Sequence, residues 1–168
     1  MVSGSEQSVA ADVGAVRAIV EGVDDPELPH VTIGDLGMVR DVEVLPDGRV
    51  IATLTPTYSG CPATEQIRDD VAAALDAAGL EARVEFVLSP PWTTDWITPS
   101  GHSKLRAAGI APPHTAGAGH ETRIDLPVAC PRCNSRRTRR LGDFGSTACK
   151  APFVCESCRE PFELFKAL

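Results

Sequence analysis

The chain has 168 residues, and 43% of them are hydrophobic, which is enough for an ordinary globular core. The net charge of −7 argues against affinity of the whole protein for nucleic acid or for an anionic membrane. That charge is unevenly spread, because residues 1–122 carry 7 basic and 18 acidic side chains while residues 123–168 carry 9 basic and 5 acidic ones. This asymmetry predicts two units.

The sequence also indicates a compartment. Its start lacks the basic and apolar regions of a signal peptide, and no apolar run approaches the roughly 18 residues that a membrane span needs. We therefore expect a cytoplasmic protein whose six cysteines stay reduced. Metal binding or redox chemistry explains these cysteines better than disulfides do.

The first predicted elements are a helix, a loop and a hairpin. Apolar residues at helical spacing predict an amphipathic helix over about 11–22. The acidic stretch 24–32, with two prolines, predicts a loop. Alternating residues on both sides of Pro46-Asp47-Gly48 predict a β-hairpin over 36–55.

The next elements follow the loop that holds Cys61. A helical pattern runs from about Ala63 to the stop signal Gly79, and alternation over 82–88 predicts a third strand. A loop with both tryptophans then leads into a short helix that ends near residue 108. For Trp92 and Trp96 we expect core or partner contacts rather than catalysis.

This order of elements predicts an α+β fold with a small, mostly antiparallel sheet. We assign this domain to residues 11–109, a linker rich in Pro, Gly and Ala to 110–122, and a separate tail to 123–168.

The tail contains two Cys-x-x-Cys pairs with 21 residues between them. Two thiolates from one tight turn can bind the same ion, and a second turn completes a tetrahedron. A tail this short cannot bury enough apolar surface to fold alone, so a structural zinc ribbon is the leading interpretation and an iron–sulfur site is the rival. The predicted metal ligands are Cys130, Cys133, Cys155 and Cys158.

Two further features of the tail stay open. Cys149 is either a buried or free thiol or an alternative metal ligand. The stretch 136–140 carries four arginines, Arg136, Arg137, Arg139 and Arg140, which suit a solvated face, a docking patch for an acidic partner, or contact with nucleic acid phosphate. No aromatic residues are interleaved with them, which argues against base stacking.

Cys61 lies between a glycine and Pro62, directly before a helical pattern. If Pro62 takes the first helical position, Cys61 falls near the N-cap, where helix amides lower a thiol pKa. A thiolate there could act as a nucleophile or as a soft metal ligand, and the alternative is a small structural cysteine. Should the acidic loop reach it, Asp25 and Glu27 would oppose thiolate formation but could bind iron as hard ligands; otherwise they form a capped turn.

Together, "DDPELPHVTIGDLGMVRDVEV", "LTPTYSGCPA" and "PPWTTDWITPSGHSKLRAAGIAPP" resemble the PaaD-type branch of the SufT-like iron–sulfur assembly domain. The tail "CPRC…FGSTACKAPFVCESCREPFELFK" is similar to the extension that marks this branch. The resemblance runs from about residue 13 to the end. The chain departs from many members of that family in ending "FKAL" without a final cysteine.

The resemblance implies a subunit of the phenylacetyl-CoA epoxidase (oxygenase) system of aerobic phenylacetate degradation. In that system a di-iron subunit oxygenates the substrate, and a reductase carries flavin and a [2Fe–2S] centre. The D-type subunit is expected to help assemble or repair a metal centre, not to turn over substrate. Cys61 matches the cysteine of the family's SGCP element, and Asp25 and Glu27 match its DPE element, which implies transient iron or cluster binding there.

The expected partners are therefore oxygenase or reductase subunits as clients. One cysteine cannot enclose a cluster, so a homodimer or a client's own thiols must complete the shell. The alternatives are a scaffold that docks through its ribbon and, with less support, a nucleic-acid-binding ribbon protein. A hydroxylating enzyme fits worst, because the chain lacks a carboxylate/histidine di-iron motif such as paired Glu-x-x-His.

Overall fold

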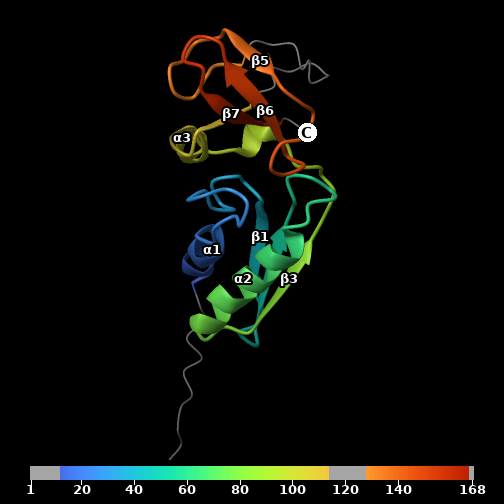
Figure 1. Ribbon diagram of the computed structural model, residues 1–168. Helices are drawn as coiled ribbons and strands as arrows, with labels where there is room; N and C mark the ends of the chain where they lie inside the picture. The colour runs from blue at the N-terminus through green and yellow to red at the C-terminus, as the bar shows by residue number, and fades with distance from the viewer. Residues whose placement is uncertain (1–11, 114–127, 167–168) are drawn as a thin grey trace, which may run out of the picture.

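In the computed structural model, which describes residues 12–113 and 128–166, a domain of helices and one sheet carries a β-ribbon at one end (Figure 1). The α+β class predicted from the sequence is confirmed. Residues 114–122 of the expected linker and 123–127 of the expected tail lie outside the described residues. The elements in chain order are α1 (Val13–Glu21), β1 (Val39–Val44), β2 (Val50–Leu54), α2 (Thr64–Ala77), β3 (Ala82–Phe86), η1 (Thr94–Trp96), α3 (Pro99–Ala107), β4 (Ile110–Ala111), β5 (Thr138–Arg140), β6 (Lys150–Cys155) and β7 (Pro161–Phe165).

The first sheet has the strand order β1-β2-β3. The predicted hairpin is confirmed, since β1 and β2 pair antiparallel and Gly48 adopts a positive φ of 86° in the turn between them. β3 pairs parallel to β2, with Val50 opposite Ala82 and Leu54 opposite Phe86. The helix α2 is therefore a crossover connection, and the loop with Cys61 leaves the carboxyl end of β2, where parallel folds commonly place binding sites.

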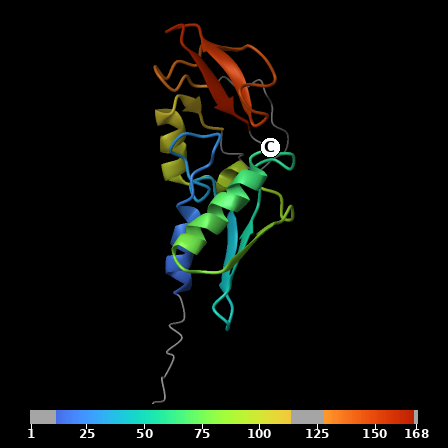
Figure 2. The same cartoon turned by 60° about the horizontal axis from the view of Figure 1, so that its bottom comes forward.

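Helices α1 and α2 lie side by side against one face of this sheet (Figures 1 and 2). The Asp12 side chain caps α1 by accepting a hydrogen bond from the Gly14 amide at 3.1 Å. Burial follows the helical period in both helices, as their amphipathic sequences predict. The buried positions are Val16 and Val20 in α1 and Ile67, Val71 and Leu75 in α2.

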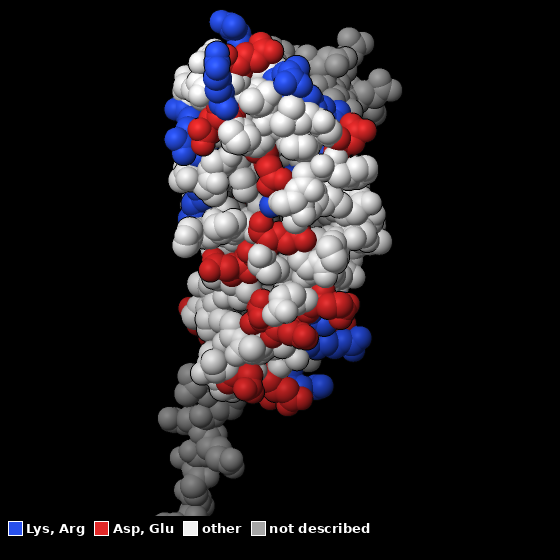
Figure 3. All heavy atoms as spheres, in the orientation of Figure 1, with Lys and Arg blue, Asp and Glu red and all other residues white. Residues whose placement is uncertain are grey.

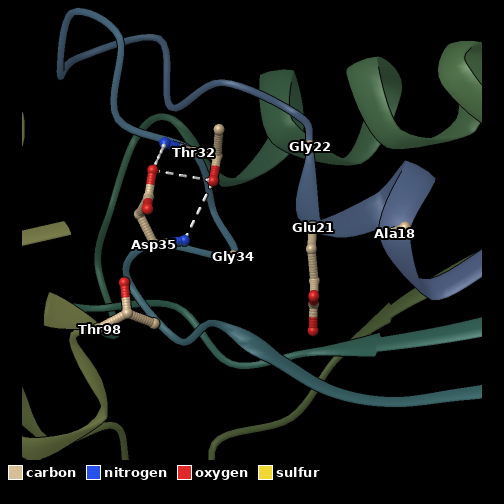
Figure 4. A pocket seen from close by; sticks show the side chains of 7 residues that line it. All are labelled: Ala18, Glu21, Gly22, Thr32, Gly34, Asp35 and Thr98. Atoms are coloured by element: carbon tan, nitrogen blue, oxygen red, sulfur yellow. Dashed lines mark hydrogen bonds between the residues drawn. The ribbon is translucent and has the colours of Figure 1, made fainter. Parts of the chain in front are cut away.

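The acidic loop after α1 is pinned to the core by three fully buried side chains, Leu28, Val31 and Ile33. Just after this loop in the sequence, Asp35 accepts hydrogen bonds from the amide and hydroxyl of Thr32, and the Asp35 amide donates to the Thr32 hydroxyl (Figure 4).

Lys104 of α3 forms an ion pair with Asp35. Burial raises the pKa of Asp35, but Lys104 and the Thr32 amide outweigh it and hold that pKa below its ordinary value. A hollow of about 350 Å³ beside this network is lined by seven residues, none of them Cys or His, so we assign the network a structural role.

The ribbon sheet has the order β4-β7-β6-β5. Its edge strand β4 comes directly after α3, so the first two residues of the expected linker, Ile110 and Ala111, pair in parallel with Glu163 and Leu164 of β7. The two units are thus joined by backbone hydrogen bonds as well as by the chain. Among the described residues no helix combines the length and apolar character needed to cross a bilayer.

Side chains of the ribbon also pack on the loops of the first domain. The rings of Trp92 and Phe165 meet edge to face with 6.0 Å between centroids, and the Trp92 indole donates a hydrogen bond to the Leu36 carbonyl at 2.9 Å. Phe165 is only 1% exposed and belongs to the core of the first domain. Trp92 therefore makes the kind of core contact that the sequence analysis expected.

We expect Phe165→Ala to lower the free energy of unfolding by roughly 3–5 kcal/mol, because it removes a buried ring shared by both units. Denaturant unfolding followed by tryptophan fluorescence measures this, since Trp92 reports the loss directly. The matched control is Phe144→Ala, at a ribbon ring that is 73% exposed, and it should leave the midpoint nearly unchanged. Equal midpoints for the two variants would contradict the assigned packing.

Candidate metal-binding sites

The four predicted ligands of the ribbon converge on one point. Their sulfur atoms all lie within 4.8 Å of one another, with 3.8 Å between Cys130 and Cys158 and 3.5 Å between Cys133 and Cys155. Four thiolates at 2.3 Å around a tetrahedral zinc ion would be separated by about 3.8 Å, so these residues fit zinc. All six cysteines of the chain are free, which agrees with the expectation that none forms a disulfide.

Backbone amides prepare this site for a metal. The Cys158 amide donates to the Cys155 sulfur at 3.5 Å, and this bond lowers the pKa of the Cys155 thiol. Bound zinc would supply folding free energy by cross-linking the turn before β5 to the turn between β6 and β7. The sulfur geometry favours zinc binding by these four residues, which stays a prediction.

Cys61 occupies a different position from the predicted N-cap. Helix α2 begins at Thr64 with Ala63 as its N-cap, and the Cys61 carbonyl accepts a hydrogen bond from the Thr64 hydroxyl at 2.7 Å. Cys61 is half-buried at the base of the exposed loop 58–60.

The predicted lowering of the Cys61 pKa is wrong. The pKa is raised, because burial opposes the charged form and the carboxylates of Glu27 and Asp25 add to that effect. The helix starts too late for its amides to outweigh these costs. The sequence left open whether the acidic loop reaches Cys61. The effect of Asp25 and Glu27 on the Cys61 pKa shows that both carboxylates lie within electrostatic reach of the thiol.

The loop with the two carboxylates is shaped by its own sequence. Pro26 fixes the backbone at the turn, and Asp25 Oδ1 accepts a hydrogen bond from the Glu27 amide at 2.8 Å. Asp25 is only 9% exposed, and burial raises its pKa to about 6. Asp35 is equally buried but is paired with Lys104, whereas no Lys or Arg within the described ranges forms a salt bridge with Asp25. An unpaired buried acid beside a thiol is typical of a functional site.

A second thiol, which the sequence analysis did not assign here, lies next to these groups. Cys149 precedes β6 and is 6% exposed, and its sulfur donates to Glu27 Oε2 at 3.7 Å. Burial is the main reason that its pKa rises to about 11. Cys149 is buried and does not join the ribbon quartet, and its role as an alternative metal ligand stays a prediction. No spacing rule could have found this contact, which joins residues 122 positions apart.

The arginine cluster lies on and just before β5, the strand at the edge of the ribbon sheet opposite β4. Arg136, Arg137 and Arg139 are exposed, whereas Arg140 is held by an ion pair with Asp143 at 2.9 Å. Basic side chains gather over the ribbon end of the molecule and acidic ones dominate the first domain on the face seen in Figure 3. The uneven charge along the sequence therefore corresponds to a difference in charge between the ribbon and the first domain on this face.

Comparisons with known proteins follow the same division. Residues 14–87 match the model described as "Iron-sulfur cluster assembly protein", and residues 114–166 match "PaaD zinc beta ribbon domain". An Escherichia coli K12 protein, whose provisional name makes it the D-type subunit of 1,2-phenylacetyl-CoA epoxidase, is 48% identical over 159 residues, which cover 93% of each chain. The chain belongs to the PaaD family. The resemblance inferred from the loop motifs is confirmed.

Two further similarities concern the first domain of this PaaD-family protein. An Fe–S protein maturation auxiliary factor of Bacillus subtilis is 42% identical over 97 residues, 56% of this chain and 91% of that protein. A crystal structure of a DUF59 domain from Bacillus anthracis aligns with a TM-score of 0.52 and 33% identity over 55% of this chain and 90% of that one. The ribbon is thus an addition to a domain that occurs alone elsewhere.

For the ribbon of this PaaD-family protein we expect about one zinc per chain, measured by elemental analysis. Cys155→Ser should lose it and also expose Trp92, because the unfolded ribbon would release Phe165. The matched control is Cys61→Ser, which removes a thiol outside the quartet and should retain full zinc. Zinc retained at the wild-type level by Cys155→Ser would contradict the ligand set.

Asp25→Asn should stabilise the protein at pH 8 by about 2–3 kcal/mol and leave its stability at pH 4 nearly unchanged. Between the ordinary value of 3.8 and about 6, folded Asp25 retains a proton that the unfolded chain releases, so wild-type stability falls as pH rises. Asparagine keeps the acceptor for the Glu27 amide and removes the charge. Thermal melts across this pH range measure the effect.

The matched control for this prediction is Asp35→Asn. The pKa of Asp35 is lowered, so its carboxylate stabilises the fold above pH 4 and that contribution is lost as pH falls. The control should therefore destabilise the protein at neutral pH. Destabilisation by both variants at pH 8 would show that Asp25 has a structural role like that of Asp35.

Proposed function

We propose that this protein is an accessory factor of a phenylacetyl-CoA oxygenase (epoxidase) system, where it helps assemble or repair an iron or iron–sulfur centre. The PaaD family and the match to an iron–sulfur assembly domain support this assignment. Unpaired thiols suit a reducing compartment, so we place the protein in the cytoplasm.

The observation that carries the proposal is the environment of Cys61. A half-buried thiol lies at the carboxyl end of a parallel strand, with a buried unpaired acid and a second carboxylate within electrostatic reach. Thiolate and carboxylate together suit ferrous iron, which accepts both soft and hard ligands. Cys61, Asp25 and Glu27 are the proposed ligands of iron or a cluster in transit.

The raised pKa of Cys61 suits transient binding. At neutral pH the sulfur holds its proton, so an arriving metal ion must displace that proton and binds less tightly than it would bind a ready thiolate. A carrier needs such exchangeable binding, because cargo held too firmly cannot be delivered. A homodimer or the thiols of a client would supply the ligands that the chain lacks for a whole cluster.

We further propose that the exposed arginines Arg136, Arg137 and Arg139, with Arg140 behind them, dock an acidic surface of an oxygenase or reductase subunit. Among the described residues only Arg140 of these four forms an ion pair, so the other three guanidinium groups can bind a partner. If Cys61 is only structural, the protein is instead a scaffold that works through this patch alone. Charge reversal of Arg136 and Arg139 tests docking, and it should weaken client binding in a salt-dependent way.

The decisive experiment follows cargo transfer. The zinc-replete protein is loaded anaerobically with ferrous iron and sulfide and mixed with the apo-reductase of the oxygenase system, and the [2Fe–2S] signal of the reductase is recorded. We expect Cys61→Ser to lower the transfer rate at least tenfold, because it removes the soft ligand. Ser59→Ala, an exposed change in the same loop, is the matched control and should transfer normally.

Complementation in cells gives the second readout. A strain lacking this protein should recover oxygenase activity on phenylacetate with the wild type and with Ser59→Ala, but poorly with Cys61→Ser. Full oxygenase activity with Cys61→Ser would show that the thiol carries no cargo and would favour the scaffold.

A further inference from the structure

The ribbon contributes its fifth cysteine to the loops of the first domain. Cys149 Sγ contacts the Glu27 carboxylate at 3.7 Å and the Thr147 hydroxyl at 3.0 Å. The neighbouring Lys150 is 5% exposed, and its ammonium group donates to the Glu27 carbonyl at 3.2 Å. Two consecutive ribbon residues therefore contact Glu27, Cys149 through the carboxylate and Lys150 through the backbone carbonyl.

The separation between these two groups suits a shared metal ion. A tetrahedral ion with sulfur at about 2.3 Å and oxygen at about 2.1 Å places the two ligand atoms about 3.6 Å apart. The observed distance of 3.7 Å differs little from this value. An ion could replace the thiol proton between them without moving either backbone.

Cys61 approaches the same place from a third segment. It packs against the apolar cluster that includes Cys149, and it is close enough to Cys149 to contribute to the raised pKa of that thiol. Among the described residues only the ribbon quartet brings three or more ligand atoms together, so Cys61 must turn toward Cys149 and Glu27 to complete the set. Cys61 is half-buried beside the exposed loop 58–60.

We propose that Cys61, Cys149 and Glu27 together bind one thiophilic divalent ion, such as Fe²⁺, at the junction of the two units. This inference rests on the proposed function and deepens it by making the ribbon a ligand donor. Binding by these three residues forms two metal–sulfur bonds and one metal–oxygen bond, both thiol protons pass to solvent, and no electron is transferred. Asp25, the other carboxylate of the proposed function, would take the fourth tetrahedral position until a ligand from the client replaces it, which would allow the ion to be handed over.

The proposal gives the ribbon two metal sites with different duties. Zinc bound by the quartet would stabilise the ribbon fold. The folded ribbon would then supply Cys149 as a ligand to the transported ion at the junction site. A metal at the junction would also cross-link the two units, so loading should tighten their packing at Trp92 and Phe165.

Cobalt titration of the zinc-replete protein tests this set under anaerobic conditions. Co²⁺ replaces Fe²⁺ as the probe, and its sulfur-to-metal charge-transfer absorption grows with the number of bound thiolates. We expect full intensity for the wild type and about half for Cys149→Ser and for Cys61→Ser, with cobalt affinity reduced at least about tenfold in each. Glu27→Gln should keep the intensity but weaken binding.

The matched control is Thr147→Val, which removes a hydroxyl bonded to the Cys149 sulfur but no proposed ligand, and it should keep full intensity. Elemental analysis must show that zinc stays in the quartet, and cobalt found only in exchange for that zinc would overturn the proposal.

The outcomes separate this inference from the proposed function. If Cys149→Ser binds cobalt with wild-type affinity and intensity while Cys61→Ser does not, the junction site is refuted and the carrier role of Cys61 stands. If neither the wild type nor any variant binds a second ion, and Cys61→Ser transfers cargo normally, both proposals fail.

Discussion

The junction between the ribbon and the acidic loop is the constraint on which the rest of the structure depends. A tail of this size buries too little apolar surface to hold its place by itself, and zinc alone would fold it without orienting it. Orientation comes from Phe165 in the first-domain core, from β4 paired with β7, and from Lys150 on the Glu27 carbonyl. Because Glu27 belongs to the loop that also holds Asp25, any change in ribbon packing reaches the candidate site directly.

The two buried carboxylates of the first domain show where stability and function compete. Asp35 is paired with Lys104 and bonded to Thr32, so its burial is compensated and the loop gains a fixed shape. Asp25 is buried to the same degree without a salt bridge in the described ranges, and the more distant Lys150 offsets its charge only in part, so Asp25 destabilises the fold at neutral pH. The free-energy cost of burying the Asp25 carboxylate would be offset by a bound cation. A metal ion beside Asp25 would therefore stabilise the fold.

Local patterns in the sequence were sufficient for most elements and for the zinc quartet, whose ligands need only two tight turns. The hairpin followed from alternation around Pro46-Asp47-Gly48, and α1 from its apolar period. The parallel pairing of β3 and the contact between Glu27 and Cys149 depend on how distant segments pack, which no local pattern encodes. The prediction for the Cys61 pKa is wrong for a related reason. The sequence indicates a helix start, but it does not show the burial and the nearby carboxylates that raise the pKa of Cys61.

The neighbours of each cysteine set the pKa of its thiol. In the ribbon, the Cys158 amide donates to the Cys155 sulfur and lowers the pKa of that thiol, whereas burial and the neighbouring sulfur atoms outweigh a backbone hydrogen bond and raise the pKa of Cys158 to about 12. At the junction, burial and carboxylates raise the pKa of both Cys61 and Cys149, so each metal–sulfur bond must first displace a proton. Metal release from the proposed junction site would therefore be helped by protons returning to Cys61 and Cys149. The difference arises from the neighbours, because amides stabilise a thiolate while carboxylates and apolar burial stabilise the thiol.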